Sequence, residues 1–240
     1  MATTTAANRL GLLLLAVVAT TAAPGVGAAP AAAAATPPFR RVYAFGDSFT
    51  DTGNTHSTTG PYSFGYVSSP PYGATFFHRS TNRYSDGRLV VDFLAETLAL
   101  PTYLPPYLSS NSNSNSSTTA VGVNFAVAGA TAIEHDFFAR NNLSIDVTPQ
   151  SIMTQLDWFD AHLRAASAGA KTRERVADAL FWVGEIGAND YAYTVVARDT
   201  IPPKLVRTMA VQRVTAFVEV CTHCSVLHDV AIVVVVVHLC

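Results

Sequence analysis

The segment that most constrains the fold is a short apolar run, Arg41 to Phe45, which stops at a glycine and presents a serine. Its apolar and aromatic residues predict a buried strand. Gly46 permits a sharp turn after this strand, and the next helix can begin close to Ser48. A serine at such a turn can be aimed at an ester carbonyl, so Gly46-Asp47-Ser48 favours a hydrolase.

Two further apolar runs end at a glycine and predict strands, Val121–Ala128 and Ala179–Val183. The segments Leu89–Leu98, before the second predicted strand, and Ile152–Leu163, before the third, repeat apolar residues at helical spacing. Strands that alternate with helices favour a parallel sheet with helices on both faces, an α/β architecture. Residues 111–119 are rich in serine, asparagine and threonine and predict an exposed loop.

Polar groups follow each of the three predicted strands: Ser48, Gly129 and Asn189. Taken alone, these residues are typical of a turn, a second turn and a helix cap. Sites in open α/β sheets form at the carboxyl ends of strands, so together the three predict a nucleophile beside two hydrogen-bond donors. Such donors stabilise the oxyanion of an acyl-transfer intermediate.

The sequence of the N-terminal segment is typical of a targeting signal rather than of part of the folded domain. Arg9 precedes an apolar run from Leu10 to Val18, and Val26-Gly27-Ala28 fits a cleavage site. We interpret residues 1–28 as a secretory signal peptide and residues 29–38 as a short leader. A membrane anchor helix is disfavoured because the run is shorter than the roughly 20 residues that spanning requires. We therefore expect a secreted, extracellular protein without a stable membrane anchor.

Composition and cysteine placement limit the partners. A net charge of −2 gives no electrostatic reason to expect nucleic acid. Sequons at Asn115 and Asn142 fit a secreted glycoprotein. The three cysteines, Cys221, Cys224 and Cys240, leave the body of the chain without a disulfide framework. The pair Cys221 and Cys224 resembles half of a zinc or redox site, but without a second pair we favour chance and expect no metal.

The chain resembles a plant GDSL esterase/lipase of the SGNH hydrolase superfamily. Five blocks carry the resemblance: Phe45–Asn54, Pro70–Phe77, Ser85–Phe93, Asn124–Thr131 and Gly184–Tyr191. It implies a three-layer α/β/α sandwich with a central parallel sheet, flavodoxin-like in kind. It also implies hydrolysis of small-molecule carboxylic esters without a metal or cofactor.

The resemblance also assigns roles to the three polar groups. Ser48 would be the nucleophile, and the oxyanion hole would comprise the N–H groups of Ser48 and Gly129 and the side chain of Asn189. Phe49 stands where the family usually has leucine. Aromatic residues after the first strand could line an acyl pocket or simply pack in the core; they are Tyr62, Phe64, Tyr66, Tyr72, Phe76 and Phe77.

One part of the family pattern is missing from this sequence. The family supplies its general base from a late Asp-x-x-His motif, and no aspartate here has a histidine three positions later. Asp160-Ala161-His162 has the wrong spacing, and we interpret His162 as a helix-surface residue. Two interpretations therefore remain: a secreted serine esterase, or a truncated or non-catalytic GDSL-like protein.

The last residues differ in character from the rest. The resemblance ends near Glu219, and residues 220–240 hold all the cysteines and the valine run Val233–Val237. This atypical tail either adds a strand to the sheet or is foreign to the family, as a retained intron would be. We favour the second interpretation, with an N-terminal part of the family domain over residues 39–219.

We predict that this chain, expressed as written, is poorly soluble or inactive. A sheet that has lost an edge strand exposes the unpaired backbone of the strand beside it. An uncharged valine run is also prone to aggregate. Hydrolysis of a p-nitrophenyl ester tests the second half of the prediction. Robust turnover that disappears in Ser48→Ala would contradict inactivity.

Overall fold

The structure is a computed structural model. It describes residues 39–63, 65–110, 121–143, 148–166, 176, 178–196, 201–224 and 231–234, all within one compact unit, Pro37–Cys240. The predicted signal peptide and leader, the loop at 111–119, the sequon at Asn115 and Cys240 lie outside the described residues. Asn142, at the second sequon, is exposed.

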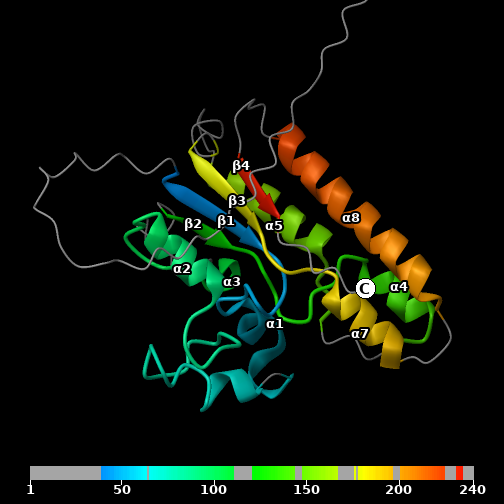
Figure 1. The fold of residues 1–240 in the computed structure, drawn as a ribbon, viewed down its shortest axis with the longest axis horizontal. Coiled ribbons are helices and arrows are strands. Elements are labelled where there is room, and N and C mark those ends of the chain that lie inside the picture. The colour runs from blue at the N-terminus through cyan, green and yellow to red at the C-terminus, as the bar shows by residue number, and fades with distance from the viewer. Residues whose placement is uncertain are drawn as a thin grey trace, which may run out of the picture. The chain divides into compact units, whose positions relative to one another are not determined.

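Four parallel strands form one sheet in the order β2-β1-β3-β4. They are β1 (Arg41–Phe45), β2 (Gly122–Asn124), β3 (Ala179–Val183) and β4 (Ala231–Val234) (Figure 1). In the register, Tyr43 of β1 is the partner of Val123 on one side and of Phe181 on the other. The parallel sheet and its helices confirm the predicted α/β fold class.

The helices connect successive strands. Those between β1 and β2 are α1 (Asn54–Ser63), η1 (Gly65–Ser68), α2 (Val90–Thr97) and α3 (Tyr107–Ser110). Those between β2 and β3 include α4 (His135–Arg140) and α5 (Ile152–Ala166), and α7 (Ala188–Val196) and α8 (Pro203–Cys224) lie between β3 and β4. The helices predicted at Leu89–Leu98 and from Ile152 onward are thus confirmed as α2 and α5.

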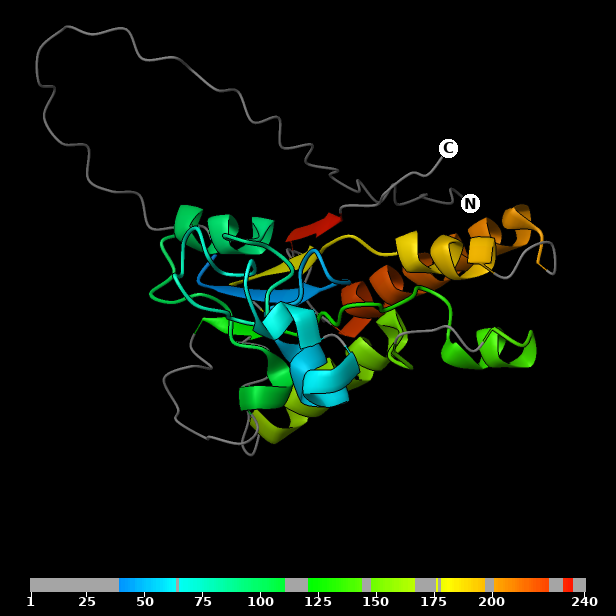
Figure 2. The same cartoon turned by 90° about the horizontal axis from the view of Figure 1, so that it is seen from below.

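Alternate residues of β1 face two separate cores, as the period of a strand requires. Val42 and Ala44 pack with Val91 of α2 on one face. Tyr43 and Phe45 pack on the other face with aromatic residues of α5 and α8, including Phe159 and Phe217. Seen edge-on, the sheet lies between α2 on one side and α5 on the other (Figure 2). The three-layer arrangement therefore follows from the alternation within β1.

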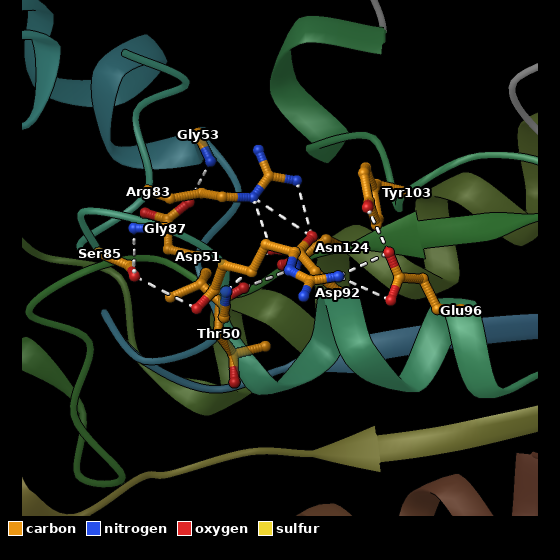
Figure 3. Close-up of polar contacts among 12 residues, drawn as sticks. Thr50, Asp51, Gly53, Arg83, Ser85, Gly87, Asp92, Glu96, Tyr103 and Asn124 are labelled. Carbon is orange, nitrogen blue, oxygen red and sulfur yellow. Dashed lines mark hydrogen bonds and ion pairs between the residues drawn. The ribbon is translucent and has the colours of Figure 1, made fainter. Parts of the chain in front are cut away.

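A buried ion pair fixes the start of α2. Asp92 accepts the Leu89 N–H at 2.9 Å and so caps the helix. The same carboxylate pairs with Arg83: Nε of Arg83 donates to Oδ2 of Asp92 and Nη2 donates to Oδ1, each at a distance of 2.9 Å (Figure 3). Both side chains are nearly inaccessible, so removal of either partner would leave an uncompensated buried charge.

The second strand is shorter than predicted. The apolar run Val121–Ala128 becomes a strand only over β2, although the Phe125 N–H still donates to the Ala44 carbonyl at 2.7 Å. On the outer side, the Asn54 side chain donates to the carbonyls of Asn124 and Ala126, at 2.8 and 2.9 Å. A side-chain amide therefore satisfies carbonyls that a further strand would otherwise pair.

The tail contributes to the sheet. Helix α8 continues through Glu219 to Cys224, and β4 pairs with β3, with Leu180 opposite Ala231. Residues 231–234 thus behave as the first interpretation of the tail expects, as an added strand. The edge of β3 is paired, contrary to the expectation that this edge is exposed. The domain limits of residues 39–219 stay a prediction.

We predict that Gly122→Ala destabilises the fold more than Gly187→Ala. Both glycines have φ near +105° (104° and 107°), so alanine strains the backbone similarly at each position. At Gly122 a Cβ would also overlap the Val42 carbonyl oxygen of β1, whereas nothing lies within 4 Å of one at Gly187. Overpacking of this kind typically costs about 1–3 kcal/mol.

Thermal unfolding followed by circular dichroism measures the difference between the two variants. We expect Gly122→Ala to melt at least 2–4 °C below Gly187→Ala, because about 1 kcal/mol shifts the midpoint by that much in a domain of this size. Equal midpoints would show that the β1–β2 contact tolerates a methyl group.

Candidate active site

The turn after β1 is held against the turn after β3. The Asp47 N–H donates to the Glu185 carbonyl at 2.9 Å. Gly46 has φ 141°, and a Cβ there would come within 3.0 Å of the same carbonyl oxygen. The turn therefore needs glycine at this position both for its conformation and for the close approach. It presents Ser48 partly exposed at the carboxyl end of β1.

The buried side chain of Gln155 clamps this turn from the helical layer. Its Oε1 accepts the Gly46 N–H at 2.9 Å, and its Nε2 donates to the Gly46 carbonyl at 2.8 Å. Gln155 is wholly inaccessible and lies on α5 one turn after Ile152. This residue was not among the site residues predicted from the sequence. A polar side chain among the apolar positions of an amphipathic helix was the available signal.

The loop after β1 is joined to the loop after β2 by Asp51. Its Oδ1 accepts the Gly53 N–H at 2.7 Å, which prepares the start of α1 (Figure 3). Its Oδ2 accepts the Thr55 N–H at 3.0 Å and the Ala128 N–H at 2.9 Å. The Asn124 side chain adds a second link by donating to the Thr50 carbonyl at 2.7 Å. An aspartate a few residues before the start of a helix is typical of such a cap, and Asp51 stands three residues before Asn54 of α1.

Gly129 lies in the loop that Asp51 holds. Its carbonyl accepts the hydroxyl of Tyr193, from α7, at 2.9 Å. Among the hydrogen bonds between described residues, none uses the Gly129 N–H or the Ser48 hydroxyl. Both groups are thus available for a further partner.

Asn189 contacts the sequence neighbours of the other two predicted site residues. Its Nδ2 donates to the Ala130 carbonyl at 2.9 Å, next to Gly129. The same nitrogen lies 3.4 Å from Asp47 Oδ2, next to Ser48. The shorter contact anchors the amide, and the longer one is weak. The carboxamide at the start of α7 therefore contacts the neighbours of both other residues, as the convergence of the strand ends predicts.

Two buried carboxyl groups flank this arrangement. Burial raises the pKa of Asp47 to about 7, and the nearby carboxyls of Glu185 and Asp190 add to the rise. Burial also raises the pKa of Asp190 to about 7, although it accepts the N–H groups of Ala132 and Ile133, each at 2.8 Å. Asp190 thereby fixes α7, and with it Asn189, to the loop after β2.

The interpretation of His162 as a helix-surface residue is wrong. Its ring packs among core aromatics, with centroids 6.0 Å from Tyr43 and 5.9 Å from Phe125. It lies seven residues beyond Gln155 on α5, which is about 10 Å of helix rise away from the turn that Gln155 holds. His162 therefore packs behind the sheet and is poorly placed to serve as a base for Ser48.

The aromatic residues proposed for an acyl pocket have other contacts where the structure describes their side chains. The guanidinium of Arg88 lies over the ring of Phe76, with Cζ 4.0 Å from the ring centroid. The guanidinium of Arg83 lies over the ring of Phe77, with Cζ 5.0 Å from the ring centroid. Tyr72 packs against Tyr84. The side chains of Tyr62, Phe64 and Tyr66 lie outside the described residues. The three described rings thus support packing rather than a pocket.

The described residues contain no cluster of three or more histidine, cysteine, aspartate or glutamate side chains that could hold a metal ion. Cys221, which belongs to α8, is buried in the core. The described side chains of the site offer a hydroxyl, amide donors and carboxyl groups.

A sequence model of the GDSL-like lipase/acylhydrolase family matches residues 42–222. The chain is 53% identical to GDSL esterase/lipase At3g48460 of Arabidopsis thaliana, over 76% of this chain and 47% of that protein. It is 44% identical to GDSL esterase/lipase At5g45910 and 40% identical to GDSL esterase/lipase At1g28590 of the same plant, over 68% of this chain in both cases.

These matches confirm the resemblance carried by the five sequence blocks. The matched regions make up 47%, 44% and 40% of the three relatives. The chain thus spans less than half the length of these curated relatives.

We predict that Asp47 makes stability depend on pH. Its pKa is about 7 in the folded chain and 3.8 without burial, so the folded chain holds the proton more tightly between about pH 4 and 7. Its stabilising effect is complete below about pH 4 and is lost as the pH rises to about 7. As the pH rises from 5 to 8, the free energy of unfolding of Asp47→Asn should increase by about 2 kcal/mol relative to that of the wild type.

Urea unfolding of both proteins at pH 5 and pH 8 measures this gain, and any pH-independent cost of the substitution cancels in the comparison. Asp157→Asn, at an exposed position of α5, controls for the loss of one negative charge. If the difference in free energy of unfolding between Asp47→Asn and wild type is the same at both pH values, the pKa of Asp47 is not raised by burial.

Proposed function

Because this chain belongs to the GDSL-like lipase/acylhydrolase family, we propose that it carries the nucleophile and oxyanion hole of a secreted serine esterase. Its substrates would be small-molecule carboxylic esters. The observation that carries this proposal is the position of the Asn189 amide, within 2.9 Å of the Ala130 carbonyl and 3.4 Å of Asp47.

Each group has a role in ester cleavage. The Ser48 hydroxyl would attack the carbonyl carbon, and the carbonyl oxygen would become negatively charged. The N–H groups of Ser48 and Gly129 and the side chain of Asn189 would donate to that oxygen. Donors that are held in place by the fold stabilise this charge without having to reorganise during the reaction. Ala130 and Tyr193 hold Asn189 and Gly129 in place.

Secretion is part of the proposal and rests on the N-terminal segment. The run Leu10–Val18 followed by Val26-Gly27-Ala28 fits a signal peptide. The sequons at Asn115 and Asn142 are compatible with passage through the secretory pathway. Among the described helices, none is both long and apolar enough to cross a membrane.

A second candidate function is ester binding without turnover. The observation that favours it is the lack of an Asp-x-x-His pair in the 240-residue sequence. Without a base, the Ser48 hydroxyl stays protonated and is a weak nucleophile. The two candidates differ in whether Ser48 reacts at all, and a small diffusible base provides a way to tell them apart.

We predict that a fluorophosphonate probe labels Ser48 of the purified chain, and that added imidazole accelerates the reaction by supplying the missing base. Asn189→Ala should slow the labelling about 100-fold, because loss of one oxyanion donor typically costs 10²–10³ in rate. Mass spectrometry of the digested protein identifies the labelled residue, and the time course gives the rate.

Ser85 is a matched internal control, because its hydroxyl donates to the Arg88 carbonyl at 3.2 Å and lies in another loop. Labelling of Ser48 no faster than of Ser85, with and without imidazole, would contradict the esterase and favour the non-catalytic protein. An unchanged rate in Asn189→Ala would remove Asn189 from the oxyanion hole.

A further inference from the structure

The stretch around the proposed nucleophile is buried except at two positions. Every residue of the fully described segment from Val42 to Thr55 is buried apart from Ser48, which is half-buried, and Phe49. Phe49 is 61% exposed. A large apolar side chain is therefore exposed at the residue that directly follows the proposed nucleophile.

The backbone that carries Phe49 is held firmly. The Phe49 N–H donates to Asp47 Oδ1, and the Thr50 N–H donates to the Asp47 carbonyl, each at 3.1 Å. Asp47 and Thr50 are almost inaccessible, at 1% and 2%. Since Asp47 and Thr50 are fixed in the interior, the turn between them holds Phe49 at the surface.

This position suits contact with a substrate. Covering an exposed aromatic ring with another apolar group removes both surfaces from water, which is favourable in proportion to the area covered. Because the backbone at Phe49 is held by hydrogen bonds, Phe49 has less conformational freedom to lose when a substrate binds. The acidic groups nearby include the carboxyls of Asp47 and Glu185, which offer no attraction to an anionic ligand.

We propose that Phe49 is the acyl-contact residue of the ester site and selects neutral esters with an extended apolar acyl chain. This inference rests on the proposed function, because it requires that Ser48 be the reacting group. The ring would lie along the acyl chain next to the carbonyl carbon, whereas an acetyl group would be too short to cover it. Phe49 would therefore affect long acyl chains much more than short ones.

The test compares two fluorophosphonate probes, one with a decyl and one with a methyl chain on phosphorus. Each reacts when the Ser48 oxygen bonds to phosphorus, fluoride leaves and the serine proton passes to the buffer base. The measured quantity is the ratio of the decyl to the methyl labelling rate at Ser48, with imidazole present. Since both probes need the same activation of Ser48, the ratio isolates the contact with the chain.

We expect Phe49→Ser to lower this ratio about tenfold, equivalent to about 1.4 kcal/mol of apolar contact. Phe49→Leu, which keeps an apolar side chain, should retain most of the ratio. Phe93→Ser is the matched control, because Phe93 is a half-exposed ring on α2 whose face is occupied by Arg88 at 4.0 Å. It should leave the ratio unchanged.

The outcomes separate this inference from the proposed function. Labelling of Ser48 with a decyl-to-methyl ratio that Phe49→Ser does not change would overturn the acyl-contact role alone. An equal fall in Phe93→Ser would also overturn it, since the effect would then come from general surface hydrophobicity. Failure of both probes to label Ser48 would overturn the serine esterase, and the acyl-contact role with it.

Discussion

The placement of the other site segments depends on the buried carboxylate of Asp51. This one side chain accepts N–H groups from the start of α1 and from Ala128, in the loop after β2. A carboxylate without water is unfavourable unless donors surround it, so the two segments that supply them must come together. Burial nevertheless raises the pKa of Asp51. The loops after β1 and β2 are thus joined by a group that would be costly to leave unpaired.

The strand order explains why the third segment arrives at the same place. The chain leaves β1 for β2 on one side and later returns to β3 on the other, so the connections diverge at the carboxyl ends of β1 and β3. Ligands of open α/β sheets bind at such a point of divergence. Ser48 follows β1 and Asn189 follows β3, and the hydrogen bond from the Asp47 N–H to the Glu185 carbonyl holds these two ends together.

The sequence could predict β1 and β3 because an apolar run bounded by glycine is a local signal. It could not predict where β2 ends, since the Asn54 amide that covers its outer carbonyls is distant in sequence. The same reason hides Gln155, whose partner Gly46 is 109 residues away. His162 was misassigned because helical spacing identifies a face only approximately, and the aromatic cluster behind β1 is wide enough to include it. The convergence of the three strand ends could be predicted because the parallel topology brings them to one edge of the sheet, and the roles of Ser48, Gly129 and Asn189 stay predictions.

The contact between Asn189 and Asp47 joins residues that are 142 positions apart, and this has a consequence for synthesis. A ribosome that adds about 5–20 residues per second needs roughly 7–30 s to pass from one to the other. During that interval the nascent chain carries its serine without the amide that completes the strand-end cluster. Assembly of the strand-end cluster is thus delayed relative to synthesis of Ser48: the serine is made first, and the contact with Asn189 can form only after the intervening residues have been synthesised.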